Sequence, residues 1–276
     1  FNLGASFSEA KDIESKTREN ALFLPVVAQF NGLISQEILA WFDKLTIISN
    51  LRSEEFKHFS FEMLEDEEFR EKIVKFIKSA DTGITDIKKK KIDFASLNIE
   101  SDELKELPDF LLEKLKEEGL STVETMHMQY DNNNMFKQLK SFSLNFESDG
   151  TQKLLALSAP LIDALLNGEI IVVDELDNSL HTDLVQAIVK LFNCPKSNPN
   201  NAQLIFSTHD TNLLNQELFR RDQIWFVQKD IYGSSELYSL IEYGEGKIRE
   251  DLALEKNYLN GKFGGKPYIS SSLMEL

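Results

Sequence analysis

The sequence is poor in cysteine, in long apolar runs and in basic residues. Cys194 is the single cysteine, which excludes an intrachain disulfide framework and fits a reducing compartment. The N-terminus has no signal-like apolar segment, and no uninterrupted apolar run is long enough to span a membrane. These absences predict a soluble, cytoplasmic protein with no membrane partner.

Acidic residues outnumber basic ones, 46 to 30, which gives a formal net charge of −16. A uniformly acidic surface repels a polyanion, so nucleic acid is not an obvious ligand of this chain. Four lysines at 88–91 could touch a phosphate backbone, but so short a run is more typical of a solvated turn or the edge of a sheet. With 276 residues and 42% hydrophobic content, the chain can bury the core of one or two domains.

An apolar strand at residues 170–173 is followed directly by two carboxylates, Asp174 and Glu175, and then by a tight polar turn. A buried strand is the rigid element that a metal site needs. One carboxylate at its end can hold Mg²⁺ while its neighbour activates a water molecule. The pattern predicts Asp174 as the metal-binding carboxylate and Glu175 as the catalytic base. The alternative is that both carboxylates only cap the next helix.

Two further segments frame this strand. Upstream, Ser148 is predicted to cap the N-terminus of a helix that has Gly150 in its first turn. Because a helix N-terminus presents N–H groups and partial positive charge, a phosphate is a natural partner there; a simple helix cap is the alternative. Downstream, the apolar strand at 203–207 leads to His209, whose imidazole could reach a terminal phosphate or could simply belong to the core.

In chain order, Ser-x-Gly-x-Gln at 148–152, an apolar strand with Asp-Glu, and a strand ending in Ser-Thr-His at 207–209 resemble the second half of an ABC-type ATPase head. Glu-Ser-Asp-Gly-Thr at 147–151, where such heads usually have Leu-Ser-Gly-Gly-Gln, is similar to the SMC-related group. More narrowly, the wording of 206–214, 220–227 and 258–264 resembles bacterial AAA-type ATP/GTP-binding proteins associated with abortive infection and phage defence. The resemblance implies an α/β fold, a P-loop NTPase of ABC type with a mainly helical inserted lobe.

The same resemblance implies ATP and Mg²⁺ as cofactors and ATP hydrolysis as the activity of the full-length protein. In such heads the signature residues, here Ser148 and Gly150, bind the γ-phosphate of a nucleotide held by the other subunit, so that a homodimer sandwiches ATP. His209 would register the γ-phosphate, while Asn178 and Ser179 would belong to a loop between the two sites. Closure of the dimer would regulate an effector protein, or act on DNA through regions outside this chain.

The chain lacks a P-loop, Gly-x-x-x-x-Gly-Lys-Ser/Thr, whose amides and lysine carry most of the phosphate binding in this class. The nearest segment, 261–267, has its first glycine one residue too close and Pro267 in place of the hydroxyl residue. Because the chain also starts at Phe1, we expect it to be the C-terminal portion of a longer protein whose earlier part holds the P-loop.

Three parts are expected along the chain. Residues 1–32 should end an N-terminal core, in which an apolar run at 21–27 forms a buried strand leading to Gln29. The resemblance makes Gln29 a sensor of Mg²⁺ and of the attacking water, with an ordinary helix-start glutamine as the alternative. Residues 33–120 carry apolar side chains at helical spacing and should form the helical lobe. Residues 121–276 should form the ATPase core, with a hairpin at 122–146 and strands near 204, 225 and 238.

Two other functions are compatible with these residues. In a metal-dependent hydrolase or nuclease, the carboxylates and imidazoles would bind metal directly. The ligands would come from Asp174, Glu175, Asp177, His181, His209 and Asp210. Alternatively, the chain is a catalytically incomplete interaction module, because a head without its P-loop should bind ATP very weakly.

Overall fold

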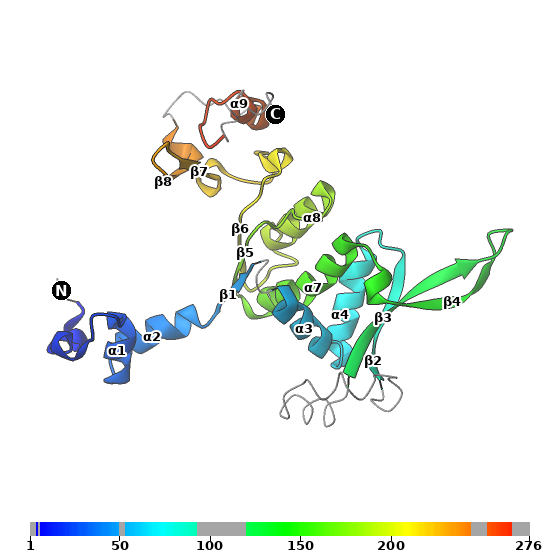
Figure 1. The fold of residues 1–276 in the computed structure, drawn as a ribbon, viewed down its shortest axis with the longest axis horizontal. Helices are drawn as coiled ribbons and strands as arrows, with labels where there is room; N and C mark the ends of the chain where they lie inside the picture. Colours follow the sequence, from blue (N-terminus) through cyan, green and yellow to red (C-terminus); the bar gives the residue numbers. More distant parts are fainter. Residues whose placement is uncertain (1–3, 5, 50–52, 93–119, 244–252, 267–276) are drawn as a thin grey trace, which may run out of the picture. The chain divides into compact units, whose positions relative to one another are not determined.

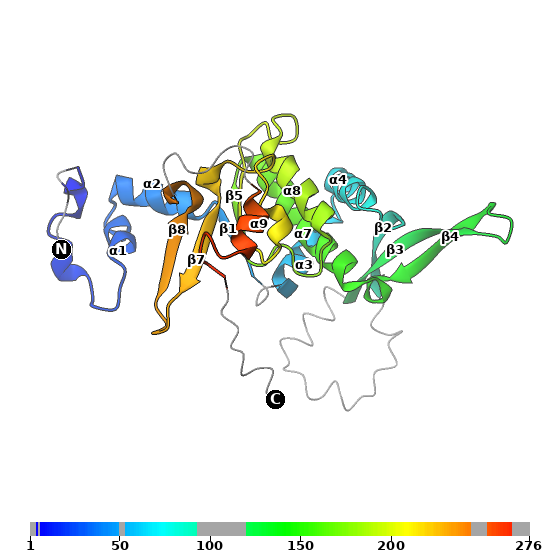
Figure 2. The same ribbon diagram turned by 90° about the horizontal axis from the view of Figure 1, so that it is seen from above.

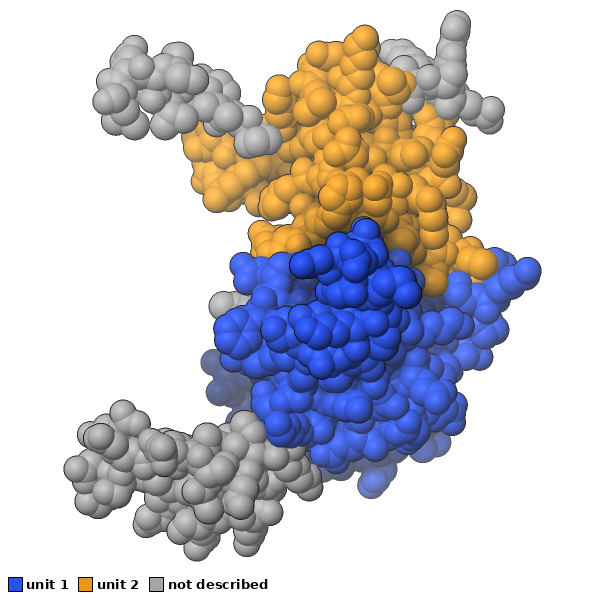
Figure 3. All heavy atoms as spheres, turned by 90° about the vertical axis from the view of Figure 1, so that its right-hand side faces the viewer, with its two compact units in different colours: residues 1–174, 195–206 blue, residues 175–194, 207–276 orange. Residues whose placement is uncertain are grey.

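A computed structural model describes residues 4, 6–49, 53–92, 120–243 and 253–266. The chain divides into two compact units, which Figure 3 colours separately. Unit 1 contains residues 1–174 and 195–206, and unit 2 contains residues 175–194 and 207–276. Each unit has its own helices and strands.

The centre of unit 1 is a parallel sheet of three strands, β1 (Leu45–Ile48), β5 (Ile170–Val173) and β6 (Gln203–Phe206), in the order β1-β5-β6 (Figure 1). The strands predicted at 170–173 and 203–207 are therefore confirmed, the second ending at Phe206, and the two pair in parallel. On one face of the sheet Ile171 is fully buried. On the other face Ile47 and Ile205 keep 49% and 53% of their surfaces exposed. Parallel sheets are usually covered on both faces, so this sheet has one apolar face that the described residues cover only partly.

Three helices of unit 1 lie side by side, α3 (Ser53–Met63), α4 (Glu67–Lys78) and α7 (Asp149–Asn167) (Figure 1). The buried side chains of α4 recur every four residues, Phe69, Ile73 and Ile77, as the apolar stripe predicted. The N-cap of α7 is Ser148, as predicted, and the helix ends at Gly168 in the left-handed conformation.

An antiparallel sheet also belongs to unit 1, with β2 (Ile84–Ile92), β3 (Leu120–Tyr130) and β4 (Phe136–Ser143) in that order. The predicted hairpin is confirmed, and its end extends away from α3, α4 and α7 in Figures 1 and 2. The four lysines lie on the edge strand β2, where Lys89 pairs with Glu65 at 2.7 Å and Lys90 with Glu124 at 3.1 Å. This confirms the interpretation of the run as the edge of a sheet.

The prediction of a strand at 21–27 is wrong, because most of this segment belongs to helix α1 (Phe23–Gln29). Helix α2 (Leu33–Phe42) follows. Proline is tolerated in the first turn of a helix, and Pro25 is the third residue of α1. Helical spacing brings Phe23 and Val27 onto a small apolar cluster around Ala10 and Ile13. Gln29 is the exposed last residue of this helix and does not end a strand.

The interval 33–120 is less uniformly helical than expected. Its described part contains α2, α3 and α4, but also β1, which pairs with β5 in the parallel sheet, and β2. A four-residue strand within a charged segment has too short a pattern to distinguish it from a helix, and its pairing with β5 decides the conformation. The helical spacing of apolar residues also predicts a stripe at 110, 111 and 115, and these positions lie outside the described residues. The division of the chain into three parts remains a prediction.

Unit 2 contains α8 (Thr182–Asn193), β7 (Trp225–Lys229), β8 (Ser235–Ser239) and α9 (Leu254–Leu259). The helix expected after Glu175 is confirmed as α8. Strands β7 and β8, expected to continue the α/β alternation, instead form an antiparallel sheet of their own. Short 3₁₀ helices complete the two units at Ser8–Ala10, Glu14–Lys16, Leu144–Phe146, Thr211–Leu213, Arg221–Gln223 and Leu240–Glu242.

The glycine-rich segment near residue 262 packs against the β7–β8 hairpin. Phe263 is 4% exposed in a core with Ile224, Phe226, Leu240 and Leu254. Gly264 has a φ of +72°, and a Cβ there would lie 2.3 Å from Oε1 of Gln228. The glycines of this segment therefore serve close packing, and this role requires no phosphate.

Candidate functional site

Strand β5 carries Asp174 to the carboxyl end of the parallel sheet in unit 1. The Asp174 N–H donates to the Ile48 carbonyl at 2.9 Å, which continues the ladder between β5 and β1 by one residue. Asp174 is exposed. In open α/β sheets ligands bind outside this end of the strands, so Asp174 occupies the position expected of a ligand-facing carboxylate.

Unit 2 begins at Glu175 with a sharp backbone turn. Glu175 has a φ of +51°, a left-handed conformation that is uncommon for a glutamate. Its N–H donates to Oγ of Ser207 at 2.8 Å, and the next N–H donates to the Ser207 carbonyl at 3.1 Å. Leu176 is fully buried, while the Glu175 side chain keeps 38% of its surface exposed. The turn thus anchors Leu176 in the core and leaves the Glu175 carboxylate partly exposed, at the cost of backbone strain.

The Glu175 carboxylate and the His209 imidazole lie next to each other in unit 2. Oε1 of Glu175 and Nε2 of His209 are 3.6 Å apart, which is an ion-pair distance and too long for a good hydrogen bond. The His209 side chain is 83% exposed. Its backbone N–H donates to both carboxylate oxygens of Asp177, at 3.3 and 3.4 Å. A carboxylate and an imidazole therefore face the same space, and Asp177 holds the backbone of His209.

The turn after Glu175 is held by its own backbone. The Asn178 N–H donates to the Glu175 carbonyl, and the Leu180 N–H donates to the Asp177 carbonyl, both at 3.0 Å. Ser179 has a φ of +60°, and its hydroxyl donates to Oδ1 of Asn178 at 3.2 Å. Both side chains are exposed, so they form a rigid polar projection from unit 2.

Two more polar residues secure the ends of this loop. His181 caps helix α8, since its Nδ1 accepts the Asp183 N–H at 3.2 Å. Asp210 accepts hydrogen bonds from the Thr182 hydroxyl at 2.5 Å and from the Asn212 N–H at 3.0 Å. Desolvation raises the pKa of Asp210, but these hydrogen bonds and the Asn212 amide outweigh it, and the pKa is lowered. Asp210 is therefore ionised and tied to α8.

In unit 1, Ser148 and Gly150 stand at the start of α7. Oγ of Ser148 accepts the Thr151 N–H at 3.2 Å and lies 3.0 Å from the Thr151 hydroxyl. Asp149 and Gly150 are the first two helical residues. A long helix concentrates partial positive charge at this end, which suits an anionic ligand, although the Asp149 carboxylate opposes it.

The structure brings together only some of the predicted residues. Glu175 and His209 meet in unit 2, and Asn178 and Ser179 lie in the loop that follows Glu175. The other four candidates belong to unit 1, namely Gln29, Ser148, Gly150 and Asp174. Sequence reasoning did not find the organising role of Ser207, whose hydroxyl and carbonyl both fix the Glu175 turn. A hydroxyl residue directly after an apolar strand is the only signal that could have indicated it.

The carboxylate and imidazole side chains of the described residues are the possible ligands of a metal ion. Within the described part of the chain, no group of three or more His, Cys, Asp or Glu side chains is arranged to hold a metal ion. Magnesium at a nucleotide site needs less from the protein, because phosphate oxygens and waters complete the shell around one or two carboxylates. Asp174, an exposed carboxylate at a strand end, fits this simpler requirement.

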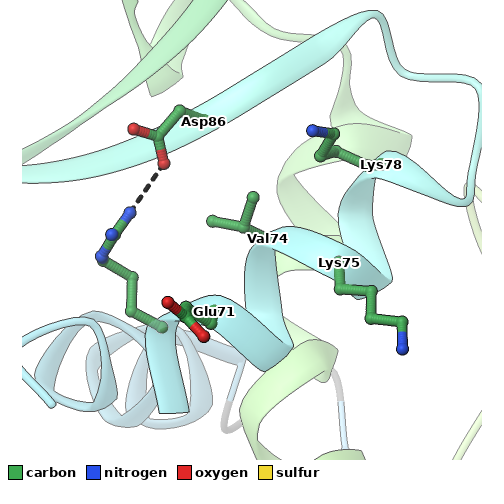
Figure 4. A pocket seen from close by; sticks show the side chains of 6 residues that line it. Glu71, Val74, Lys75, Lys78 and Asp86 are labelled. Carbon is green, nitrogen blue, oxygen red and sulfur yellow. Dashed lines mark hydrogen bonds and ion pairs between the residues drawn. The ribbon is translucent and has the colours of Figure 1, made fainter. Parts of the chain in front are cut away.

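A surface hollow of about 320 Å³ lies between α4 and β2 in unit 1 (Figure 4). Its lining consists of Arg70, Glu71, Val74, Lys75, Lys78 and Asp86. Arg70 is already bonded to Asp86 at 2.7 Å and to Glu67 at 2.6 Å. The hollow contains none of the candidate residues, and its guanidinium is committed to neighbouring carboxylates.

Comparison with known families now decides the class. The model of the family described as "AAA domain, putative AbiEii toxin, Type IV TA system" matches residues 7–215, well over half of the chain. The chain belongs to this AAA family. Membership places it among the nucleotide-binding P-loop NTPases, whose α/β fold agrees with the parallel sheet and its helices. The family description also refers to abortive infection and toxin–antitoxin systems.

No curated protein matches the chain. Among the helices that the structure describes, none is both long and apolar enough to cross a membrane.

Proposed function

We propose that this AAA-family chain is part of an ABC/SMC-like head that binds and hydrolyses ATP, dimerises around it, and regulates a partner or effector. Phage defence is the setting that we propose from the family description, which names a putative AbiEii toxin and a type IV toxin–antitoxin system. A role in DNA-associated processes rests on the resemblance to SMC-related heads alone. The observation that carries the proposal is the meeting of Glu175 and His209, two residues that follow β5 and β6 in the sequence. A helix cap alone would explain the acidic residues but not the exposed imidazole beside them.

The roles follow from the chemistry of each group. Glu175 is the general base that takes a proton from the attacking water, since its carboxylate is partly exposed and held by a rigid turn. His209 donates a hydrogen bond to the γ-phosphate, where negative charge develops during transfer. Asp174 would hold Mg²⁺, which neutralises charge on the phosphate oxygens when it is bound.

Dimerisation would give a role to the candidate residues other than Asp174, Glu175 and His209. The N-terminus of α7, with Ser148 and Gly150, would engage the γ-phosphate of a nucleotide bound by a second copy. The rigid projection of Asn178 and Ser179 would lie at that interface. Asp149 places a negative charge beside the phosphate and would weaken ATP-driven closure. For Gln29 the proposal rests on resemblance alone, because its place at the end of α1 offers no support.

A segment that carries a P-loop is still required for tight ATP binding. Ile47 and Ile205 are half-exposed on an apolar face of the parallel sheet that the described residues cover only partly, and a further helix of an α/β fold would fit against this face. Without that segment the chain acts as an interaction module. Calorimetry should detect no micromolar ATP binding to these 276 residues alone, and such binding would show that the P-loop segment is dispensable.

The test of the catalytic assignment uses Glu175→Gln in the protein that carries the P-loop. Turnover should fall by at least about a hundredfold, the usual contribution of a general base, while ATP affinity stays unchanged. Glu236→Gln is the matched control, since this carboxylate is exposed on β8 of the same unit. Full turnover in the Glu175 variant would remove the base assignment and with it the proposed hydrolysis mechanism.

A further inference from the structure

A partly buried carboxylate directly before α7 is bonded to strand β3. Oε1 of Glu147 accepts a hydrogen bond from the Thr125 hydroxyl at 2.5 Å and lies 2.7 Å from Nε2 of His127. The Glu147 side chain is only 12% exposed, and Thr125 is fully buried. The Thr125 hydroxyl thus donates to this carboxylate, and Nε2 of His127 lies within hydrogen-bond distance of the same oxygen. Enclosing a carboxylate in this way is stabilising only when such partners are present.

The main chain of Glu147 is bonded to α7, whereas its side chain is bonded to β3. Its carbonyl accepts the side-chain amide of Gln152 at 3.0 Å, and Gln152 lies in the first turns of α7. The next residue is Ser148, the N-cap of the helix. Glu147 therefore joins β3, through its side chain, to the start of α7, through its backbone.

The imidazole in this arrangement is also held from β4. The His127 and Phe142 rings meet edge to face, with centroids 5.4 Å apart and planes at 80°. His127 is paired with Lys140 across the hairpin, so its backbone register is set by β4 as well. The orientation of the Glu147 carboxylate thus depends on both strands of the hairpin.

We propose that Glu147 is a positioning residue that fixes the first turn of α7 for nucleotide binding, with Thr125 and His127 setting the direction of its carboxylate. This inference rests on the proposed function of Ser148 and Gly150. Movement of the β3–β4 hairpin would be transmitted to the phosphate-binding end of α7 through these two hydrogen bonds. A carboxylate that only stabilised unit 1 would affect stability but not the apparent affinity for ATP.

The test measures KM and kcat for ATP in the protein that carries the P-loop. Glu147→Ala should raise KM by about tenfold, since a displaced binding turn loses alignment with the phosphate. Glu147→Gln keeps an oxygen that can accept both hydrogen bonds and should retain a KM within about twofold of the wild type. This difference between the two variants distinguishes positioning from a requirement for charge.

Glu124→Ala is the matched control. Glu124 neighbours Thr125 on β3 and accepts a similar pair of bonds, from the Ser141 hydroxyl at 2.7 Å and the Lys90 ammonium at 3.1 Å. These bonds remain within the antiparallel sheet and do not reach α7. KM should not change in this control, whatever its melting temperature.

Two failures are distinguishable with Ser148→Arg in the same assay. If Ser148→Arg abolishes turnover while Glu147→Ala leaves KM unchanged, the positioning role is overturned and the signature assignment stands. If Ser148→Arg leaves turnover unchanged, the proposed function of the α7 N-terminus is itself wrong. Equal KM increases in Glu147→Ala and Glu124→Ala would also overturn the inference, since they would reflect general damage to the sheet.

Discussion

Replacing Glu175 by glycine should make unit 2 more stable while it destroys ATP turnover. Glu175 has a φ of +51°. This conformation costs a non-glycine residue about 1–2 kcal/mol. Glycine adopts it freely but loses about 0.5–1 kcal/mol more entropy on folding, so the net gain is about 0.5–1 kcal/mol. The lost pairing with His209 offsets little of this, because the pair is 3.6 Å apart and the imidazole is 83% exposed.

The assay compares urea or thermal unfolding of three variants. Glu175→Gln keeps the strained backbone and should match the wild type in stability. Ser179→Gly relieves a similar strain, at a φ of +60°, and should gain a similar amount. A gain of this size corresponds to a rise in melting temperature of about 1–4 °C. If Glu175→Gly were less stable than Glu175→Gln, the backbone at this turn would not be strained, and the argument would fail.

Two further predictions concern unit 1. Desolvation raises the pKa of Glu9, but hydrogen bonds from the Ser35 hydroxyl and from the N–H groups of Ile34 and Ser35 outweigh it and lower the pKa. The Glu9 carboxylate thus caps the first turn of α2. Because its pKa is lower in the folded state, its contribution to stability is complete above the ordinary glutamate pKa of about 4.3 and is lost as the pH falls further. Stability measured against pH should therefore decline less steeply below about pH 5 in Glu9→Gln than in the wild type, and identical slopes would contradict the cap. Gly168→Ala should cost about 2–4 kcal/mol, because its φ is +68° and the new Cβ would lie 2.4 Å from the Asn200 carbonyl oxygen. Gly261→Ala is the control, because Gly261 has a similar φ of +74° but no atom lies within 4 Å of the added Cβ. The difference between the two losses of stability measures the cost of the clash with Asn200. Equal losses would show that this clash costs nothing.

The parts of the site that could be predicted are those set by local pattern. Ser148 caps a helix because its hydroxyl satisfies an N–H of the first turn, whatever the surrounding fold. Asp174 follows β5 because an apolar run bounded by charge is typical of a buried strand. These placements needed no knowledge of distant contacts.

The parts that could not be predicted depend on tertiary partners. Residues 23–29 are helical because their apolar side chains pack on Ala10 and Ile13, and two adjacent valines misleadingly favoured a strand. Strand β1 exists through its pairing with β5. The left-handed turn at Glu175 depends on Ser207, which is 32 residues away in sequence. The local sequence offers only one signal of such a partner, a hydroxyl residue directly after an apolar strand.

The most direct test of the central claim is a mixing experiment with Ser148→Arg and Glu175→Gln, each in the protein that carries the P-loop. Each variant alone should be inactive, because one lacks the signature contact and the other lacks the base. In a mixed dimer, one of the two sites combines an intact Glu175 with an intact Ser148 from the other subunit. Random mixing should therefore restore about a quarter of the wild-type rate, since half of the dimers would contain one working site. No recovery on mixing, or full turnover in either variant alone, would contradict a dimeric head in which two copies share each ATP.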